Sequence, residues 1–180
     1  MKHFNIAVVA GDGIGPEVIA EGKKVFAGIA QIDGNFTVDF QDFPWGCEYY
    51  LKTSEMMPAD GLDILRPFDA VYLGAVGYPG VPDHISLGEL LLQIRRGFDQ
   101  YINLRPVRLL KGAPCPLADV SPADINMIVV RENSEGEYAN VGAHLYPGTE
   151  REMALQTGVF SRHGCERVIH YAYELARRER

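Results

Sequence analysis

The sequence contains few cysteines and no long apolar stretch. Its three cysteines, Cys47, Cys115 and Cys165, lie far apart and form neither a CxxC pair nor a Cys/His spacing typical of a metal site. A disulfide framework and a structural zinc site are therefore not indicated, and a reducing compartment is expected. No stretch approaches the ~20 apolar residues that a membrane helix needs, and charged residues interrupt any secretion-signal pattern in residues 1–20. We predict a soluble, cytoplasmic protein that does not bind membranes.

Basic residues are also in deficit. The chain has 17 lysines and arginines against 24 acidic residues, which gives a formal net charge of −7. This balance argues against nucleic acid as the main partner, because affinity for nucleic acid comes largely from cationic contacts with phosphates. A group of arginines that converges on one place is more informative against such an acidic background. Hydrophobic residues make up 47% of the 180 residues, which is enough to bury a core.

Short apolar segments alternate with segments of helical periodicity along the chain. Strands are predicted at residues 4–10, 37–43, 70–75, 103–110, 126–131 and 153–160, and helices after Pro16, at 60–65, from a capping box formed by Ser86 and Glu89, and from Ser161 to Arg178. This alternation predicts an α/β fold with a largely parallel sheet flanked by helices. The proline-containing segment 111–124 is predicted to be a linker or a crossover.

A glycine-rich segment, GDGIGPE at residues 11–17, lies between the first predicted strand and the first predicted helix. Glycine allows a tight turn and lets a ligand approach the backbone closely. The spacing is not G-x-G-x-x-G, so the standard dinucleotide-binding fingerprint is absent. On spacing alone, an ordinary strand-to-helix turn is a commoner explanation than a ligand-binding loop.

Three arginines are candidates for binding carboxylates. Arg95 lies on a predicted helix, Arg105 within a predicted strand, and Arg131 at the end of a strand, where α/β sheets place ligand groups. A guanidinium group can donate two parallel hydrogen bonds to one carboxylate. Three converging arginines would therefore suit a substrate with two carboxylates. Taken singly, each arginine is more commonly part of an ordinary surface ion pair.

Tyr138 follows Arg131 by seven residues in a charged segment and could act as a general acid. A packing role is the commoner one for any of the nine tyrosines. The five histidines belong to no recognisable catalytic triad, and no G-x-S-x-G elbow is present. Hydrolase chemistry therefore has no support in the sequence.

Together, these segments resemble the isopropylmalate/isocitrate dehydrogenase family of β-decarboxylating dehydrogenases. The resemblance is carried by GDGIGPE at 11–17, RRGFDQYINLRP at 95–106 and RENSEGEY at 131–138. MMPADG at 56–61 and VPDHISL at 81–87 are similar to the tartrate/D-malate dehydrogenase branch. The resemblance covers essentially the whole chain, which corresponds to the amino-terminal half of family members.

The resemblance implies an incomplete two-domain fold. Residues 1–100 would be the first part of a cofactor-binding domain, and residues 101–180 the first part of a domain for substrate binding and dimerisation. The implied activity is the NAD-dependent oxidation, and in this family also the decarboxylation, of a malate- or tartrate-like 2-hydroxy diacid by a homodimer. The alternative substrate is 3-isopropylmalate.

The resemblance also assigns roles to individual residues. Arg95, Arg105 and Arg131 would bind the substrate carboxylates, Tyr138 would protonate the carbon left after carbon dioxide departs, and Ile14, Ala75, Val76 and Gly77 would contact NAD. The family's catalytic lysine and its ligands for Mg²⁺ or Mn²⁺ are expected beyond residue 180, so we assign no metal ligand within this chain.

One departure and two alternatives remain. Gly88 and Glu89 stand where the resemblance leads us to expect Trp-Gly, which leaves the choice of diacid open. The absence of the expected metal ligands allows a non-catalytic product, or a subunit that only pairs with an intact relative. A flavodoxin-like module that binds an anion at Gly11–Gly15 is a third hypothesis.

Overall fold

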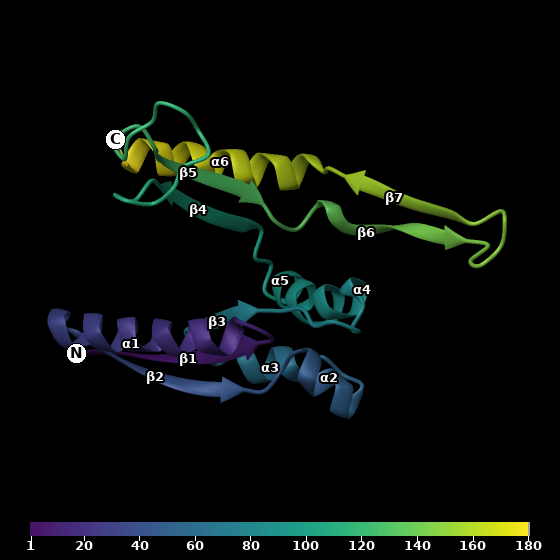
Figure 1. The fold of residues 1–180 in the computed structure, drawn as a ribbon, viewed down its shortest axis with the longest axis horizontal. Coiled ribbons are helices and arrows are strands. Elements are labelled where there is room, and N and C mark those ends of the chain that lie inside the picture. The colour runs from purple at the N-terminus through teal and green to yellow at the C-terminus, as the bar shows by residue number, and fades with distance from the viewer. Residues whose placement is uncertain (180) are drawn as a thin grey trace. The chain divides into compact units, whose positions relative to one another are not determined.

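The computed structural model describes residues 1–179 (Figure 1). The chain divides into two compact units, Met1–Gly97 and Phe98–Arg180, and each is described by itself. No helix in the described part of the chain is long and apolar enough to cross a membrane.

The first unit contains a parallel sheet flanked by helices. Its elements are β1 (Lys2–Gly11), α1 (Gly15–Asp33), β2 (Phe36–Phe43), α2 (Cys47–Thr53), α3 (Gly61–Leu65), β3 (Ala70–Ala75), α4 (Asp83–Ser86), the π-helix η1 (Leu87–Leu91) and α5 (Leu92–Gly97). The strand order is β2-β1-β3, and both pairings are parallel. The predicted α/β class, with a parallel sheet and flanking helices, is confirmed.

The central strand β1 is buried from Ile6 to Val9, where both of its faces are apolar. Ile6 and Val8 belong to a core cluster with Ile19 of α1. Side chains alternate along a strand, so Ala7 and Val9, both fully buried, point to the opposite face. A continuous apolar run is the pattern expected of a parallel strand covered on both sides, as the sequence predicted.

The helix predicted to open at Ser86 begins three residues earlier, at Asp83, so the capping-box prediction is wrong. Pro82 has the extended conformation of an N-cap residue, and Asp83 places an acidic group in the first turn, where the helix dipole favours it. Ser86 is helical and buried, and its side chain makes no capping hydrogen bond. The helix α2 was not predicted.

The second unit contains two antiparallel strand pairs and one long helix. Its elements are β4 (Ile102–Arg108), β5 (Asn126–Glu132), β6 (Gly136–Leu145), β7 (Met153–Val159) and α6 (Arg162–Arg178). β4 pairs with β5, and β6 pairs with β7, both antiparallel. The parallel arrangement is therefore confined to the first unit. β6 was not predicted, because small residues interrupt its apolar alternation.

Helix α6 begins as the sequence predicted, and it packs on β5 (Figure 1). The Ser161 hydroxyl oxygen accepts a hydrogen bond from the Gly164 N–H at 2.9 Å, which caps the helix. The β6–β7 hairpin extends away from α6, and every residue of β7 is exposed (Figure 1).

Candidate functional site

The strand order gives the glycine-rich segment a special position in the first sheet. From β1 the chain crosses to β2 on one side and then returns to β3 on the other side, so the ends of β1 and β3 flank a topological switch point. Open α/β sheets bind ligands at the carboxyl ends of their strands at such a point. Ile14 follows β1, while Ala75 ends β3 and is followed by Val76 and Gly77. The four predicted cofactor-binding residues therefore lie at one edge of the sheet.

Asp12 joins the segments that form this edge. Its buried carboxylate accepts backbone N–H hydrogen bonds from Cys47 at 2.8 Å, Glu48 at 3.3 Å and Gly77 at 3.1 Å. Its own N–H donates to the Ala75 carbonyl oxygen at 2.7 Å. Asp12 thus ties the turn after β1 to the segment after β3 and to the start of α2. Sequence reasoning missed this role and considered Asp12 only as part of the glycine-rich turn.

The glycines at this edge do two different things. Gly11 has φ +73°, and a Cβ there would lie 2.0 Å from the Ala75 carbonyl oxygen, so close strand packing requires glycine. Gly13 and Gly77 also have positive φ, but a Cβ at either position would meet no atom within 4 Å. Their backbone is open to an approaching ligand, and the Ile14 side chain is 63% exposed. This edge therefore fits a ligand that lies against exposed backbone.

Cys47 should be chemically inert in the folded protein. Burial, the hydrogen bond with Asp12 and the charge of that carboxylate raise the pKa of the Cys47 thiol to about 12. Because the thiolate is the reactive form, a disulfide reagent at about pH 8 should modify Cys47 at least ~100-fold more slowly than the exposed Cys165. Mass spectrometry of the labelled peptides measures the two rates, and labelling in guanidinium is the control. Equal rates in the folded protein would contradict this assignment.

In the second unit, Arg131 and Tyr138 are in direct contact. The Arg131 Nη2 donates a hydrogen bond to the Tyr138 hydroxyl at 2.7 Å, and the guanidinium carbon lies 5.1 Å from the centre of the tyrosine ring. Arg131 lies near the end of β5 and Tyr138 near the start of β6. The fold therefore brings together a predicted carboxylate-binding residue and the predicted acid.

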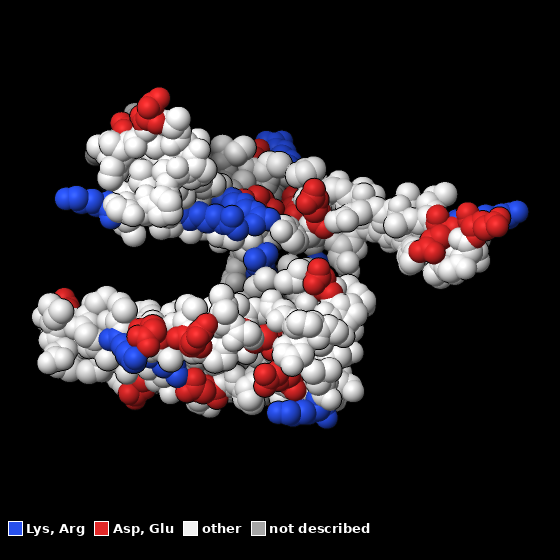
Figure 2. Space-filling view, in the orientation of Figure 1, with Lys and Arg blue, Asp and Glu red and all other residues white. Residues whose placement is uncertain are grey.

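Arg105 lies on the same face of the β4–β5 pair as Arg131. Asn103 is directly opposite Arg131 in the antiparallel register, and Arg105 is two residues further along β4. The Arg105 Nε donates to the Asn103 side-chain oxygen at 3.2 Å. Diagonal neighbours on one face are about 7–8 Å apart, so both guanidinium groups can reach one small dicarboxylate. Figure 2 shows basic side chains gathered over β4.

Arg95 lies on α5 of the first unit, directly after the π-helix, and its side chain is half-buried. It belongs to a different unit from Arg105 and Arg131, so its part in a shared site stays a prediction. A metal site was predicted to lie outside this chain. Within residues 1–179, no three or more His, Cys, Asp or Glu side chains are grouped so that they could hold a metal ion.

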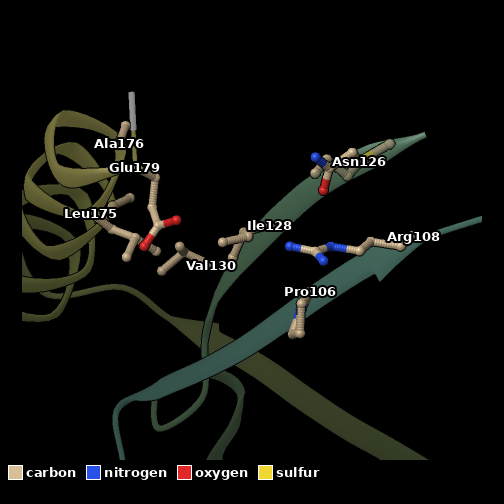
Figure 3. Close-up of a pocket in the computed structure, with 10 residues that line it drawn as sticks. Pro106, Arg108, Asn126, Ile128, Val130, Leu175, Ala176 and Glu179 are labelled. Atoms are coloured by element: carbon tan, nitrogen blue, oxygen red, sulfur yellow. The ribbon is translucent and has the colours of Figure 1, made fainter. Parts of the chain in front are cut away.

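A groove between α6 and the β4–β5 pair is separate from the two arginines. It has a volume of about 470 Å³ and is lined by Pro106, Arg108, Asn126, Met127, Ile128, Val130, Ala172, Leu175, Ala176 and Glu179 (Figure 3). Pro106 and Arg108 alternate with Arg105 along β4, and Val130 precedes Arg131, so this lining belongs mainly to the opposite face. The groove is therefore not part of the candidate substrate site.

The segment between Arg131 and Tyr138 is held by its own side chains. The Glu132 carboxylate accepts hydrogen bonds from the Ser134 N–H at 2.9 Å, the Ser134 hydroxyl at 2.6 Å and the Glu135 N–H at 2.8 Å. Burial opposes ionisation of Glu132, but these bonds outweigh it and lower the pKa of that carboxyl. Asn133 is buried, and its backbone and side-chain amides donate to the Tyr101 and Gln100 carbonyls before β4.

Glu135 connects this segment to the start of α6. Its carboxylate accepts hydrogen bonds from the Ser161 N–H at 2.8 Å and the Ser161 hydroxyl at 2.5 Å, and these bonds lower the pKa of Glu135. Ser161 therefore caps α6 and binds the loop at the same time.

We expect Ser161→Ala to lower the free energy of unfolding of the second unit by about 1–2 kcal/mol, the usual effect of removing a helix cap. Because the pKa of Glu135 is depressed in the folded state, its contribution is present above the ordinary carboxyl range and is lost as the pH falls through the folded-state value. The difference in the free energy of unfolding between wild type and Ser161→Ala should therefore become smaller in acid. Urea denaturation followed by circular dichroism at neutral and acidic pH measures it.

The matched control for this prediction is Ser121→Ala. Ser121 makes the same kind of backbone and hydroxyl hydrogen bonds to the Asp124 carboxylate, but on an exposed turn that caps no helix of the second unit. Ser121→Ala should change the free energy of unfolding of the second unit by no more than about 0.5 kcal/mol. Equal losses in the two variants would show that Ser161 has no special role.

The chain is an α/β protein with a topological switch point between β1 and β3, and it carries two arginines on one face of the β4–β5 pair. The chain belongs to the isocitrate/isopropylmalate dehydrogenase family, whose family model matches residues 5–180. The predicted family resemblance, including its tartrate/D-malate branch and its amino-terminal half, is confirmed.

Individual relatives agree with this assignment. The chain is 52% identical over 178 residues to the decarboxylating D-malate dehydrogenase of Escherichia coli (strain K12), covering 98% of this chain and 49% of the relative. It is 48% identical over 180 residues to the tartrate dehydrogenase/decarboxylase of Pseudomonas putida, covering 98% and 49%. The crystal structure of isocitrate dehydrogenase from Methylococcus capsulatus is similar with a TM-score of 0.75 and 28% identity, covering 98% of this chain and 48% of that one. The chain spans about half the length of the curated relatives it matches.

Proposed function

We propose that these residues form the amino-terminal half of a cytoplasmic, NAD-dependent dehydrogenase that oxidises and decarboxylates a malate- or tartrate-like 2-hydroxy diacid. The contact between Arg131 and Tyr138, with Arg105 on the same strand face, is the observation that carries this proposal. It puts a carboxylate-binding group beside a hydroxyl that can donate a proton. The activities for which the D-malate and tartrate relatives are named support the substrate class.

Arg105 and Arg131, together with Arg95, would bind the two carboxylates of the substrate. Guanidinium groups suit this role because each offers a planar pair of N–H donors that matches a carboxylate and stays charged at any physiological pH. Binding both carboxylates fixes the carbon chain between them. The carbon that bears the hydroxyl group is then held in one orientation.

NAD would be bound at Ile14 and Ala75–Gly77, and it supplies the acceptor for the hydride removed from the hydroxyl-bearing carbon. The open backbone at Gly13 and Gly77 and the exposed Ile14 side chain support this assignment. The family also implies Mg²⁺ or Mn²⁺, but the described residues offer no ligand group for it. We propose that its ligands come from residues other than these.

Tyr138 would complete the reaction as a general acid. When carbon dioxide leaves, the carbon left behind must accept a proton, and the Tyr138 hydroxyl can donate it. The tyrosine oxygen then carries a negative charge. Arg131, which already donates a hydrogen bond to that oxygen, would stabilise this charge.

The active protein would be a homodimer that uses the second unit. The β6–β7 hairpin supports this proposal, because its strands expose apolar side chains along their length, including Val141, Leu155 and Val159. Solvent-exposed apolar surface of this kind commonly marks an interface.

The test is an NADH assay on two proteins with Mn²⁺ and D-malate, tartrate or 3-isopropylmalate. One protein is the 180-residue chain, and the other, the joined enzyme, continues this chain with the second half of the E. coli D-malate dehydrogenase. We expect turnover of D-malate or tartrate by the joined enzyme, slower turnover of 3-isopropylmalate, and none by the chain alone. A folded joined enzyme that is inactive with all three substrates overturns the proposal. Turnover by the chain alone would overturn the assignment of the metal ligands to other residues.

A further inference from the structure

Arg167 on α6 connects two segments that border the candidate acid site. Its Nη1 contacts both carboxylate oxygens of Asp99, at 3.0 and 2.8 Å, and its Nη2 donates to the Ser134 hydroxyl oxygen at 2.8 Å. The guanidinium group also stacks over the Tyr101 ring, with its carbon 4.3 Å from the ring centre. One side chain therefore contacts both the segment before β4 and the loop between β5 and β6.

Arg167 differs from the other paired arginines of α6. The Arg167 side chain is only 19% exposed, whereas those of Arg162 and Arg177 are 87% and 65% exposed in pairs with glutamates on their own helix. Such surface pairs contribute little to stability. The three contacts of Arg167 need a flat, forked cation, which lysine cannot replace.

The contact with Ser134 continues toward Arg131. The Ser134 hydroxyl accepts from Arg167 and donates to the Glu132 carboxylate at 2.6 Å. Glu132 in turn accepts the backbone N–H groups of Ser134 and Glu135, which fixes the turn. This turn separates Arg131 from Tyr138, so its shape decides whether the two side chains meet.

We propose that Arg167 is a positioning residue, which holds the 132–135 turn in the conformation that brings Arg131 to Tyr138. Without Arg167, the Ser134 hydroxyl loses its donor, and the turn loses its link to Asp99 and Tyr101. The expected loss of the contact between Arg131 and Tyr138 does not depend on the enzymatic activity. The consequence for catalysis rests on the proposed function.

The experiment measures the environment of Tyr138 by NMR of the chain labelled with ¹³C at the tyrosine Cζ. Tyr138→Phe identifies the resonance among the nine tyrosines. Arg131→Met defines the change in chemical shift that follows loss of the direct contact. We expect Arg167→Met to shift the Tyr138 resonance by at least half of that change. Arg167→Lys should bring the resonance only slightly back toward its wild-type position. Arg177→Met, the matched control on the same helix, should leave the resonance in place.

An unmoved Tyr138 resonance in folded Arg167→Met would overturn the proposal. If circular dichroism shows that this variant does not fold, Asp99→Gly decides instead. It removes the carboxylate that holds Arg167, suits the positive φ of +46° at this position, and leaves the hydrogen bond between Ser134 and Glu132 in place. A shift in the same direction supports the proposal, and no shift overturns it.

The joined enzyme separates positioning from simple loss of stability. There, Arg167→Met should lower kcat at least ~10-fold, the scale of a misplaced catalytic group, while the KM for NAD stays unchanged. Equal kcat values for Arg167→Met and wild type would contradict the catalytic consequence. If the joined enzyme is inactive without any substitution, the proposed function fails, and the NMR result alone decides the role of Arg167.

Discussion

Asp12→Ala is expected to lower the free energy of unfolding of the first unit by about 2–4 kcal/mol, because hydrogen bonds to a charged group contribute about 1.5–3 kcal/mol each and one of its three donors is fully buried. Asp12 is only 3% exposed, and its carboxylate accepts three backbone N–H groups, from Cys47, Glu48 and Gly77. Alanine would leave the buried Cys47 N–H without a partner, and it would remove the acceptor of the Glu48 and Gly77 N–H groups, which belong to exposed residues. Each buried donor without a partner costs about 1–3 kcal/mol, and water that enters the space would recover part of the loss.

Trp45 makes this prediction measurable for the first unit alone. It is the one tryptophan in the sequence, and it is buried. It lies two residues before Cys47, whose N–H donates a hydrogen bond to the Asp12 carboxylate. Its fluorescence during urea denaturation therefore reports unfolding around Asp12.

Two further variants sharpen the interpretation. Asp42→Ala is the matched control, because Asp42 forms an exposed ion pair with Lys23 that should contribute no more than about 1 kcal/mol. Asp12→Asn keeps the size of the side chain but replaces one acceptor oxygen with an N–H donor, so we expect an intermediate loss. A loss in Asp12→Ala no larger than in Asp42→Ala would show that Asp12 does not hold this edge together.

The sequence predicted the parallel sheet because its signals are local. The run from Ile6 to Val9 is apolar without interruption, which predicts a buried central strand whatever surrounds it. Helix starts were harder to predict. Ser161 caps α6 because the chain at Ser161 is still extended, whereas Ser86 lies in a helix that has already begun after Pro82. The conformation of the backbone before the serine decides whether the serine caps a helix or lies inside one. The spacing of serine and glutamate in the sequence does not encode that conformation.

The candidate site was predictable only in part, for a similar reason. Arg105, Arg131 and Tyr138 stand in segments that resemble a family, so their types and order were sufficient to propose them as site residues. Asp12 and Arg167 are different, because their roles depend on partners 65 and 68 residues away, Gly77 and Asp99. Nothing near either residue in the sequence indicates burial, and a buried charge becomes visible only when the fold supplies its hydrogen-bond partners.

Tyr138→Phe is expected to reduce the kcat of the joined enzyme about 10²–10⁴-fold, the range for loss of a general acid. The substitution removes only the hydroxyl, so the ring can keep its position beside Arg131 and the KM for the diacid should change little. Oxidation precedes the proton transfer assigned to Tyr138. Loss of carbon dioxide also precedes it, so the variant should still transfer hydride to NAD and release carbon dioxide. The slow step then becomes protonation of the carbon left behind.

The ratio of NADH to carbon dioxide tests this order of steps. The complete reaction releases one carbon dioxide for each NADH, because each diacid loses one hydride and one carboxyl group. In Tyr138→Phe, the ratio should stay at one, and in a single turnover the protonated keto product should appear clearly later than NADH and carbon dioxide. Tyr146→Phe is the control, since Tyr146 is an exposed tyrosine in the turn of the same β6–β7 hairpin, and its kcat and product ratio should match wild type. If Tyr138→Phe keeps the wild-type kcat and forms the keto product as fast as NADH, another group must supply the proton, and the contact of Tyr138 with Arg131 then serves only to orient the arginine.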